Sequence, residues 1–298
     1  MTTSSNTPQT PTLPAGLSTG FLKTLGIAAL LVIIWQQWDF FISIFVNVLL
    51  WIYSILGAGP HMFGVAIILF TILIRFVTWP LNAQQLKSSA AMQELQSDKE
   101  WIAIQKKYAK DREKLAQEQM RIQRERGINM FGGCLPTLIQ FPIIIALYQS
   151  ITRALASTPL DLLKLSRSII FPFLNVSEII PLNSKFLWMN LGLSESVNVF
   201  GFALPTLAII VALTTYVQSK LTLPPSANPN DQSAAMGQSM SITMPLMLGW
   251  FALTFPSGLS VYFITSNLLG IAQYAAMGKA NWRNLLPGGN QPQQSQKK

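Results

Sequence analysis

The sequence predicts an all-α, polytopic membrane protein, and three observations carry that prediction. Half of the 298 residues are hydrophobic and only 11% are charged, whereas a soluble domain has about 25% charged residues. Several apolar runs are long enough to cross a bilayer. The charged residues gather between those runs, above all in residues 81–128. This composition argues against an ordinary soluble enzyme and against intrinsic disorder.

The N-terminal part divides into three segments. Residues 1–20 are rich in Thr, Ser, Pro and Gly and contain no charged side chain, which predicts a disordered leader. Residues 21–38 are predicted to form an N-terminal membrane anchor. Residues 39–58 have the pattern of an interfacial amphipathic helix, because their polar residues share one arc of a helical wheel. These residues are Asp39, Ser43, Asn47, Ser54 and Gly57. A spanning helix whose polar stripe faces its neighbours is the alternative for this segment.

Five apolar runs predict the core. The first core transmembrane helix is expected in residues 59–80, where the 19 residues from 62 to 80 would span ~28 Å, about one bilayer core. The other four are expected within residues 129–278, with an extracytoplasmic loop at 153–198 and a cytoplasmic loop at 218–240. Their apolar runs are 132–152, 199–217, 241–255 and 259–277.

Residues 81–128 are predicted to form a cytoplasmic helical hairpin. The segment is rich in Ala, Gln, Lys and Glu and has no glycine before Gly127. Its apolar residues recur mostly at helix-like steps, and its length fits two helices with a turn near residues 109–111.

The distribution of basic residues gives the orientation. A cytoplasmic location for Lys23, residues 81–128, residues 218–240 and the basic tail 279–298 puts 16 Lys and Arg residues inside and four outside. The positive-inside rule favours that arrangement, with the C-terminus in the cytoplasm. The same rule accounts for the net charge of +9 without direct nucleic-acid recognition.

Conventional catalytic and metal sites find no support in the sequence. Cys134 is the single cysteine and His61 the single histidine, so one chain can form neither an internal disulfide nor a Cys/His metal cage. The sequence also lacks GxSxG, Walker and HExxH motifs. We therefore predict no catalytic residue, no metal and no cofactor.

Arg75 is a charged residue inside the first core run, five residues before Pro80. A buried arginine in a membrane costs from ~2.5 to more than ~10 kcal/mol. One interpretation is a side chain that snorkels to the cytoplasmic headgroups. The other is an arginine in a water-filled cavity of the bundle, and Thr71 and Thr78 on the same helix face favour it.

Other core runs carry polar residues but no carboxylate that could neutralise Arg75. Gln140 interrupts the second run, Thr214, Thr215 and Gln218 end the third, and Gln273 lies in the last. An arginine without a fixed counter-ion is suited to receive a transient negative group. For most of the other polar residues, taken one by one, the alternative is a structural hydrogen bond between helices. The predicted substrate groove consists of Arg75, Thr71, Thr78, Gln140, Tyr262, Ser266 and Asn267.

Three motifs resemble one family. GGCLPTLIQFPIIIALYQSI at 132–151 and FPSGLSVYFITSNLLGIAQ at 255–273 closely resemble signatures of YidC-type membrane protein insertases. FTILIRFVTWPL at 70–81 resembles the first core span of that family, with Arg75 at its arginine position and Thr71 at its polar partner. Many relatives carry two tyrosines where this chain has Tyr262 and Phe263.

The resemblance implies a short form of the family, without a large extracytoplasmic domain. It implies five core transmembrane helices around a polar groove that opens to cytoplasm and lipid, an interfacial amphipathic helix before them and a mobile cytoplasmic hairpin. The implied function is that of an insertase and folding chaperone for nascent membrane proteins in the lipid bilayer, with no covalent reaction. The Sec translocon and the ribosome are candidate partners.

Two other classes of function compete with this one: a small-solute channel or transporter, and a structural membrane assembly factor. A transporter would be favoured by inverted repeats or acidic coupling residues, and the sequence shows neither. The expected location is a bacterial plasma membrane, with a thylakoid membrane as the alternative.

The predicted topology can be tested by thiol labelling after replacement of Cys134. Because of the charge bias, single cysteines at Ser184 and Ser194 should react with an impermeant reagent from outside the cell. Cysteines at Ser97 and Ser233 should react only after the membrane is opened. Labelling of the Ser97 variant in intact cells would reverse the orientation.

Overall fold

The computed structural model describes residues 26, 32, 36–96, 98–108, 111–127, 131–155, 158–172, 174, 179, 182–199, 202–222, 232–278 and 282–285. The predicted leader, most of the predicted anchor and most of the tail lie outside these residues. Residues 1–41 and 42–298 are two separate units. In the first unit, the rings of Trp38 and Phe41 lie 5.8 Å apart.

The described elements are almost all α-helical, which confirms the predicted fold class at that level. Five helices correspond to the predicted core runs: α3 (Met62–Val77), α7 (Phe131–Ala154), α10 (Thr206–Thr222), α11 (Gln232–Thr254) and α12 (Ser257–Ala276). The other helices are α2 (Trp38–Ile55), α4 (Trp79–Gln96), α5 (Lys99–Lys107), α6 (Arg112–Glu125), α8 (Pro159–Ser168) and the 3-10 helix η1 (Trp282–Leu285).

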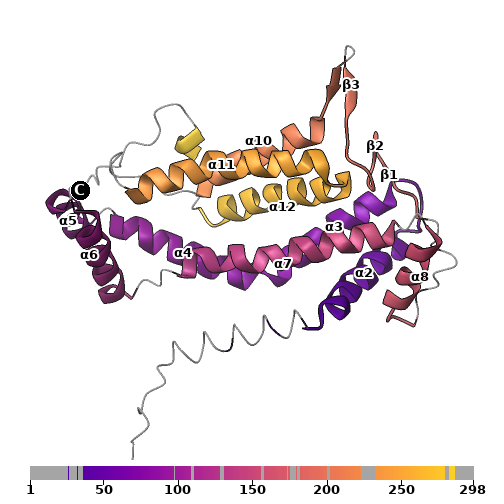
Figure 1. The fold of residues 1–298 in the computed structure, drawn as a ribbon, viewed down its shortest axis with the longest axis horizontal. Helices are drawn as coiled ribbons and strands as arrows, with labels where there is room; N and C mark the ends of the chain where they lie inside the picture. Colours follow the sequence, from indigo (N-terminus) through magenta and orange to yellow (C-terminus); the bar gives the residue numbers. More distant parts are fainter. Residues whose placement is uncertain are drawn as a thin grey trace, which may run out of the picture. The chain divides into compact units, whose positions relative to one another are not determined.

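Helix α12 is central to the packing of the core helices. It contacts α10 along its length and also touches α3 and α7, while α10 packs against α11 on another side (Figure 1). Nine of the first eleven residues of α12 are buried, among them Val261, Tyr262 and Phe263. Polar residues on α12 therefore face other helices rather than the surroundings of the protein.

Helix α11 begins well before its predicted apolar run, at Gln232 rather than at Ser241. The intervening residues include Ala, Met and Gln, which favour helix without adding hydropathy. Hydropathy marks only the apolar part of a helix, so the predicted loop 218–240 is shorter in the structure, with α10 ending at Thr222.

Asn47 joins α2 to the end of α8. This side chain is fully buried, and its Nδ2 donates to the carbonyl oxygens of Ser43 and Ser168, each at 2.7 Å. Its Oδ1 accepts from the amides of Ile170 at 2.9 Å and Phe171 at 3.0 Å. Asn47 thereby satisfies backbone groups that the end of α8 leaves unpaired. At this position the polar arc of residues 39–58 packs against protein.

The loop between α8 and α10 contains two short antiparallel pairs. Strands β1 (Lys185–Phe186) and β2 (Met189–Asn190) form one pair, and β3 (Val197–Val199) and β4 (Phe202–Leu204) form the other. In the register, Phe186 is paired with Met189, and Val197 with Leu204.

The β1–β2 pair is fastened to the starts of α3 and α12. His61 has a left-handed backbone conformation with φ 66°. Its Nδ1 accepts a hydrogen bond from the backbone amide of Leu187 at 3.0 Å. Ser257 Oγ donates to the carbonyl of Asn190 at 2.7 Å. We call these contacts, together with the packing of Phe186 on Gly64, the loop latch.

Glu195 caps the start of α10. It accepts from Trp188 Nε1 at 3.0 Å, Thr206 Oγ1 at 2.6 Å and the Leu207 amide at 3.0 Å. Partial burial acts to raise the pKa of Glu195, but these hydrogen bonds outweigh it and lower the pKa. The carboxylate is therefore held in its charged form at a helix N-terminus, where negative charge is favourable.

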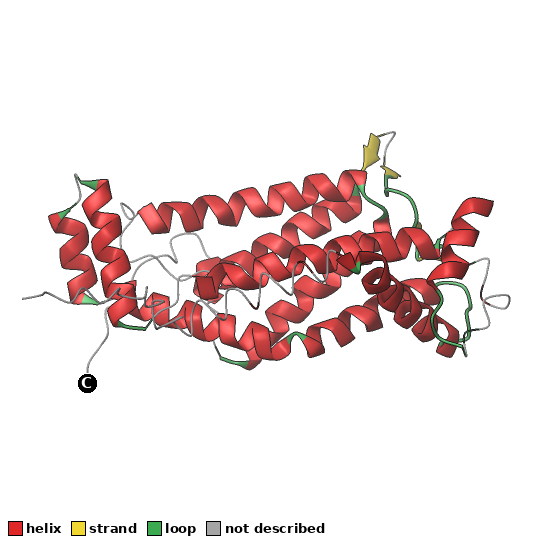
Figure 2. Ribbon diagram, turned by 60° about the horizontal axis from the view of Figure 1, so that its bottom comes forward, coloured by secondary structure: helices red, strands yellow, loops and turns green. Residues whose placement is uncertain are grey.

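The charged insert is built from α4, α5 and α6 (Figure 1), and Figure 2 shows that helices make up most of the described chain. Helix α4 follows α3 after a break at Thr78, and Pro80 lies in its first turn, where the missing N–H costs nothing. Leu95, Trp101 and Ile122 form a small core among the three helices, with Ile104 beside them.

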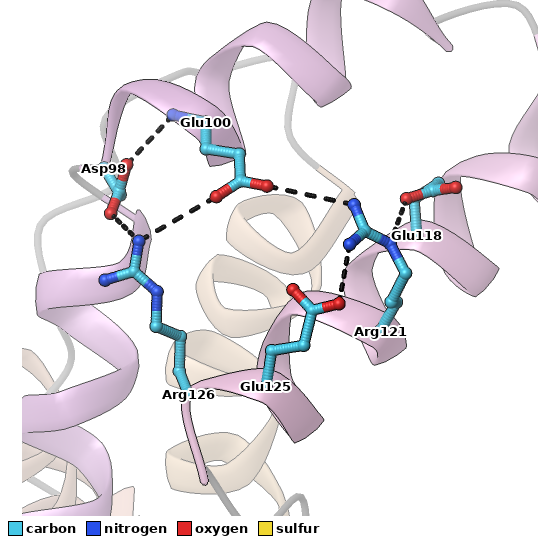
Figure 3. Close-up of polar contacts among 6 residues, drawn as sticks. All are labelled: Asp98, Glu100, Glu118, Arg121, Glu125 and Arg126. Atoms are coloured by element: carbon cyan, nitrogen blue, oxygen red, sulfur yellow. Dashed lines mark hydrogen bonds and ion pairs between the residues drawn. The ribbon is translucent and has the colours of Figure 1, made fainter.

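Ion pairs join the start of α5 to the end of α6, so these two helices run antiparallel (Figure 3). Arg126 lies 2.6 Å from Asp98, and Arg121 lies 2.8 Å from Glu118 and 2.7 Å from Glu125. The Glu100 amide, and then Arg126, lower the pKa of Asp98, whereas the bonds from Glu118 and Glu125 raise the pKa of Arg121. These pairs are exposed, so they orient the helices more than they stabilise them.

One described helix, α2, combines the length and hydropathy needed to cross a membrane, with a mean hydropathy of 1.7 and 44% of its residues buried. A buried helix of a soluble protein can pass the same test. Shorter apolar helices are found at Met62–Val77, Thr206–Leu221 and Ser241–Thr254.

The loop latch gives a stability prediction. A methyl group at Gly64 would overlap the ring of Phe186, and such overpacking costs about 1–3 kcal/mol, more than the gain of about 1 kcal/mol from Ala in a helix. Gly64→Ala should therefore lower the midpoint of thermal unfolding in detergent. In a Phe186→Ala background the same change should be neutral or stabilising. An equal effect in both backgrounds would show that the ring does not limit this position.

Candidate functional site

Arg75 is bound to α12 through a single serine. Its Nε donates to Ser266 Oγ at 3.0 Å, and its Nη2 donates to Ser266 Oγ at 2.7 Å and to the Ser266 carbonyl at 2.5 Å. None of the ion pairs among the described residues includes Arg75. The guanidinium therefore sits on neutral acceptors, and within the described part of the chain its Nη1 has no hydrogen-bond acceptor.

Gly270 makes room for this arrangement, one turn after Ser266 on α12. A Cβ at this position would lie 2.5 Å from Gln218 Nε2 and 3.3 Å from Arg75 Nη2. The end of α10 and the guanidinium of α3 therefore both approach the backbone of α12 at one point. Gly270 was not among the predicted groove residues, and Gln218 was noted only as a polar position, because their proximity depends on tertiary packing.

Gln140 and Tyr262 form the second contact of the site. Gln140 Nε2 donates to the hydroxyl of Tyr262, which joins α7 to α12. Tyr262 is 2% exposed and lies one turn before Ser266 on α12. The structure thus brings Arg75, Ser266, Tyr262 and Gln140 together from three helices.

The other three predicted residues make contacts elsewhere. Thr71 is fully buried, and its hydroxyl donates to the Ile67 carbonyl of its own helix at 2.7 Å. The Thr78 hydroxyl similarly donates to the Ile74 carbonyl at 2.9 Å. The periodicity predicted both on the face of Arg75, but a threonine in a helix commonly bonds back to its own backbone, as both do here.

Asn267 points to α10 rather than to Arg75. Its Nδ2 donates to Thr214 Oγ1 at 3.1 Å and to Thr215 Oγ1 at 2.8 Å. Asn267 is adjacent to Ser266 in the chain, so the two side chains leave the helix about 100° apart and reach different neighbours. One link joins α12 to α3 and the other joins it to α10.

The site is made of hydrogen-bonding groups and one positive charge, at the meeting point of α3, α7 and α12. Among the described residues, no group of three or more His, Cys, Asp or Glu could hold a metal ion. Such a site can bind and shield polar or negative groups in an otherwise apolar bundle, which is a property of membrane proteins that handle polar cargo.

Comparison with known proteins gives the family. The family model of the 60Kd inner membrane protein matches residues 51–283, and the chain therefore belongs to that family. It is 34% identical over 244 residues to "Membrane protein insertase YidC" of Oceanobacillus iheyensis, which covers 80% of this chain and 83% of that protein. It is 36% identical over 215 residues to "Membrane protein insertase MisCA" of Bacillus subtilis, with 71% and 68% covered.

Chloroplast proteins and a solved structure are also similar. The chain is 33% identical over 231 residues to "Inner membrane protein ALBINO3, chloroplastic" of Arabidopsis thaliana, covering 74% of this chain and 47% of that protein. A crystal structure described as an active YidC insertase with its first transmembrane domain resolved matches with a TM-score of 0.50 at 27% identity. That match covers 82% of this chain and 46% of the solved chain, so this protein spans about half the length of the solved chain.

Proposed function

We infer that this chain is a membrane protein insertase, which moves nascent membrane proteins into the lipid bilayer. One observation of the structure supports this most directly: Arg75 lies in an apolar helix, bonds to Ser266 of α12 and forms no ion pair with a described carboxylate. The chain belongs to a family of inner membrane proteins, and relatives that are named insertases match most of its length.

We propose that α3, α7, α10, α11 and α12 are the five core transmembrane helices. Large apolar side chains exposed on α3 and α11, such as Phe76, Leu246 and Trp250, would then face lipid. We further propose an N-terminal anchor at 21–38, an interfacial position for α2, a bacterial plasma membrane location and a cytoplasmic C-terminus. The charge bias between the loops supports the orientation.

In the proposed mechanism, α5 and α6 catch the nascent chain at the cytoplasmic face. The polar segment that must be translocated enters beside Arg75, where Gln140 and Tyr262 extend the polar surface and shorten the low-dielectric path. The apolar segment moves along the core helices into lipid. Burial of about 20 apolar residues drives the step, and the groove lowers the barrier for the polar part.

The substrates of this mechanism are newly made membrane proteins, delivered from the ribosome or the Sec translocon. After insertion the same surface would shield unpaired polar groups while helices assemble, which is the chaperone activity. Reconstitution of the purified protein into liposomes with a newly synthesised substrate tests the proposal. A channel or transporter would pass solutes without inserting the substrate, and an assembly factor would act only on proteins already inserted.

The hairpin should act in capture rather than in the packing of the core. Its small core of Leu95, Trp101 and Ile122 lies wholly within residues 88–124, so replacing that segment by a short Gly/Ser linker removes it as a unit. We expect a folded, membrane-embedded protein with reduced insertion. Folding is measured by thermal unfolding in detergent and insertion by protease protection. Loss of folding would make the hairpin a structural element.

Arg75 should act through its charge. A charge-assisted hydrogen bond contributes about 1.5–3 kcal/mol, so Arg75→Ala should lower insertion of substrates with acidic translocated segments by roughly tenfold or more. Arg75→Lys keeps the charge but loses the planar fork and should retain substantial insertion, while Arg75→Glu should be worst. Protease protection in proteoliposomes measures these effects.

Two controls make the Arg75 experiment specific. Substrates whose translocated segment lacks acidic residues should be much less sensitive to all three variants. Arg121→Ala removes an exposed arginine of the hairpin and should leave the difference between acidic and neutral substrates unchanged. Equal loss for acidic and neutral substrates in Arg75→Ala would reject the charge mechanism and leave Arg75 a role in holding α3 to α12.

A further inference from the structure

A crevice of about 280 Å³ lies between α3 and α12, near the C-terminal ends of both helices. Its apolar walls are formed by Ile72, Phe76, Trp79, Leu269, Ala272 and Ala276. On α3, Ile72 and Phe76 lie about 100–160° around the helix from Thr71 and Thr78. The crevice therefore opens beside the predicted stripe of polar groove residues and shares only Arg75 with it.

Gln273 gives the crevice an unusual polar group. This side chain lines the crevice and is only 6% exposed, and among the described residues no group accepts a hydrogen bond from its Nε2. Arg75, which also lines the crevice, carries only donors. A buried donor without an acceptor is destabilising, so a ligand that supplies an acceptor would be bound here.

The surroundings of the crevice indicate the class of that ligand. Phe76 is 74% exposed and Leu268 is 53% exposed, so the face around the crevice is one that lipid would cover. Trp79 lies just past the end of α3, and tryptophan is enriched at that level of a membrane, where headgroups meet acyl chains. The volume of the crevice is many times the roughly 30 Å³ of one water, so it has room for part of a hydrocarbon chain.

We propose that this crevice binds a diacyl phospholipid. One acyl chain lies along Ile72, Phe76 and Leu269, and the ester carbonyl of the lipid accepts a hydrogen bond from the Gln273 amide, which rotates toward it about its side-chain torsions. An ester carbonyl supplies an acceptor for Gln273 Nε2 and adds no donor beside Arg75. The proposal rests on the membrane position of α3 and α12 in the proposed function, but not on insertion activity.

The test is native mass spectrometry of the full-length protein, purified in detergent and offered an ester phospholipid and its diether analogue with the same headgroup. The wild type should retain one phospholipid and prefer the ester roughly two- to tenfold, the range for one net hydrogen bond. Equal retention of ester and ether lipid would overturn the carbonyl contact. Capture of a substrate's apolar segment in a lipid-free crevice by photo-crosslinking would overturn the lipid as occupant.

Three variants separate the walls of the crevice from its polar group. Ala272→Phe fills the crevice and should abolish retention, whereas Ala275→Phe, an exposed alanine of the same helix outside the crevice, should not. Gln273→Leu should still retain lipid but lose the ester preference. Wild-type retention in Ala272→Phe, or an unchanged ester preference in Gln273→Leu, would overturn the proposal. Insertion is measured in parallel, so that the two proposals are tested separately. If the wild type inserts substrate normally but retains no lipid, only the lipid site is overturned. If the wild type retains lipid but inserts no substrate, only the insertase function is overturned.

Discussion

The arrangement of α3, α10 and α12 depends on finding neutral partners for one guanidinium inside an apolar bundle. An unpaired charge in such a place is costly, and no described carboxylate pairs with Arg75. Ser266 supplies both a hydroxyl and a carbonyl oxygen, which fixes the level at which α3 meets α12. Gly270 then has to lack a side chain, because Gln218 and Arg75 occupy the adjacent space.

The opposite end of the same helix pair is fastened differently. Ser257 and Gly258, at the start of α12, donate backbone hydrogen bonds to the carbonyls of Leu193 and Leu191, and Ser257 adds a side-chain bond to Asn190. His61 ties the start of α3 to the same loop. One end of the α3–α12 pair is thus held by two backbone and two side-chain hydrogen bonds to one loop, whereas the other holds a charge and an apolar crevice. That asymmetry suits a protein that receives cargo from one side.

The sequence predicted site residues where a polar side chain is energetically costly in an apolar run. It could not predict residues whose role depends on a neighbour that is distant in the chain. Arg75, Gln140 and Ser266 stand out as polar residues in apolar runs, and the structure brings them together with Tyr262. The role of Gly270 cannot be deduced from a run of apolar residues, since only the approach of Gln218 gives it one. Asn47 was assigned to a polar arc, yet three of its four hydrogen-bond partners lie more than 100 residues away in the chain. The start of α11 was also predicted wrongly, because the helix begins as a polar segment at Gln232, nine residues before its apolar run.

Of the two arginines with the best-defined contacts, only one fits the proposed capture of a polar segment. Arg121 is exposed and surrounded by Glu118, Glu125 and Glu100, and its pKa is raised by bonds that already neutralise it. An incoming carboxylate would have to compete with these side chains and with water, which screens the interaction. Arg75 has only the oxygens of Ser266 as hydrogen-bond acceptors among the described residues, in surroundings where the same charge interacts more strongly. The lack of a fixed counter-ion therefore makes Arg75 costly to bury. For the same reason, Arg75 is available to a transient counter-ion such as an incoming carboxylate.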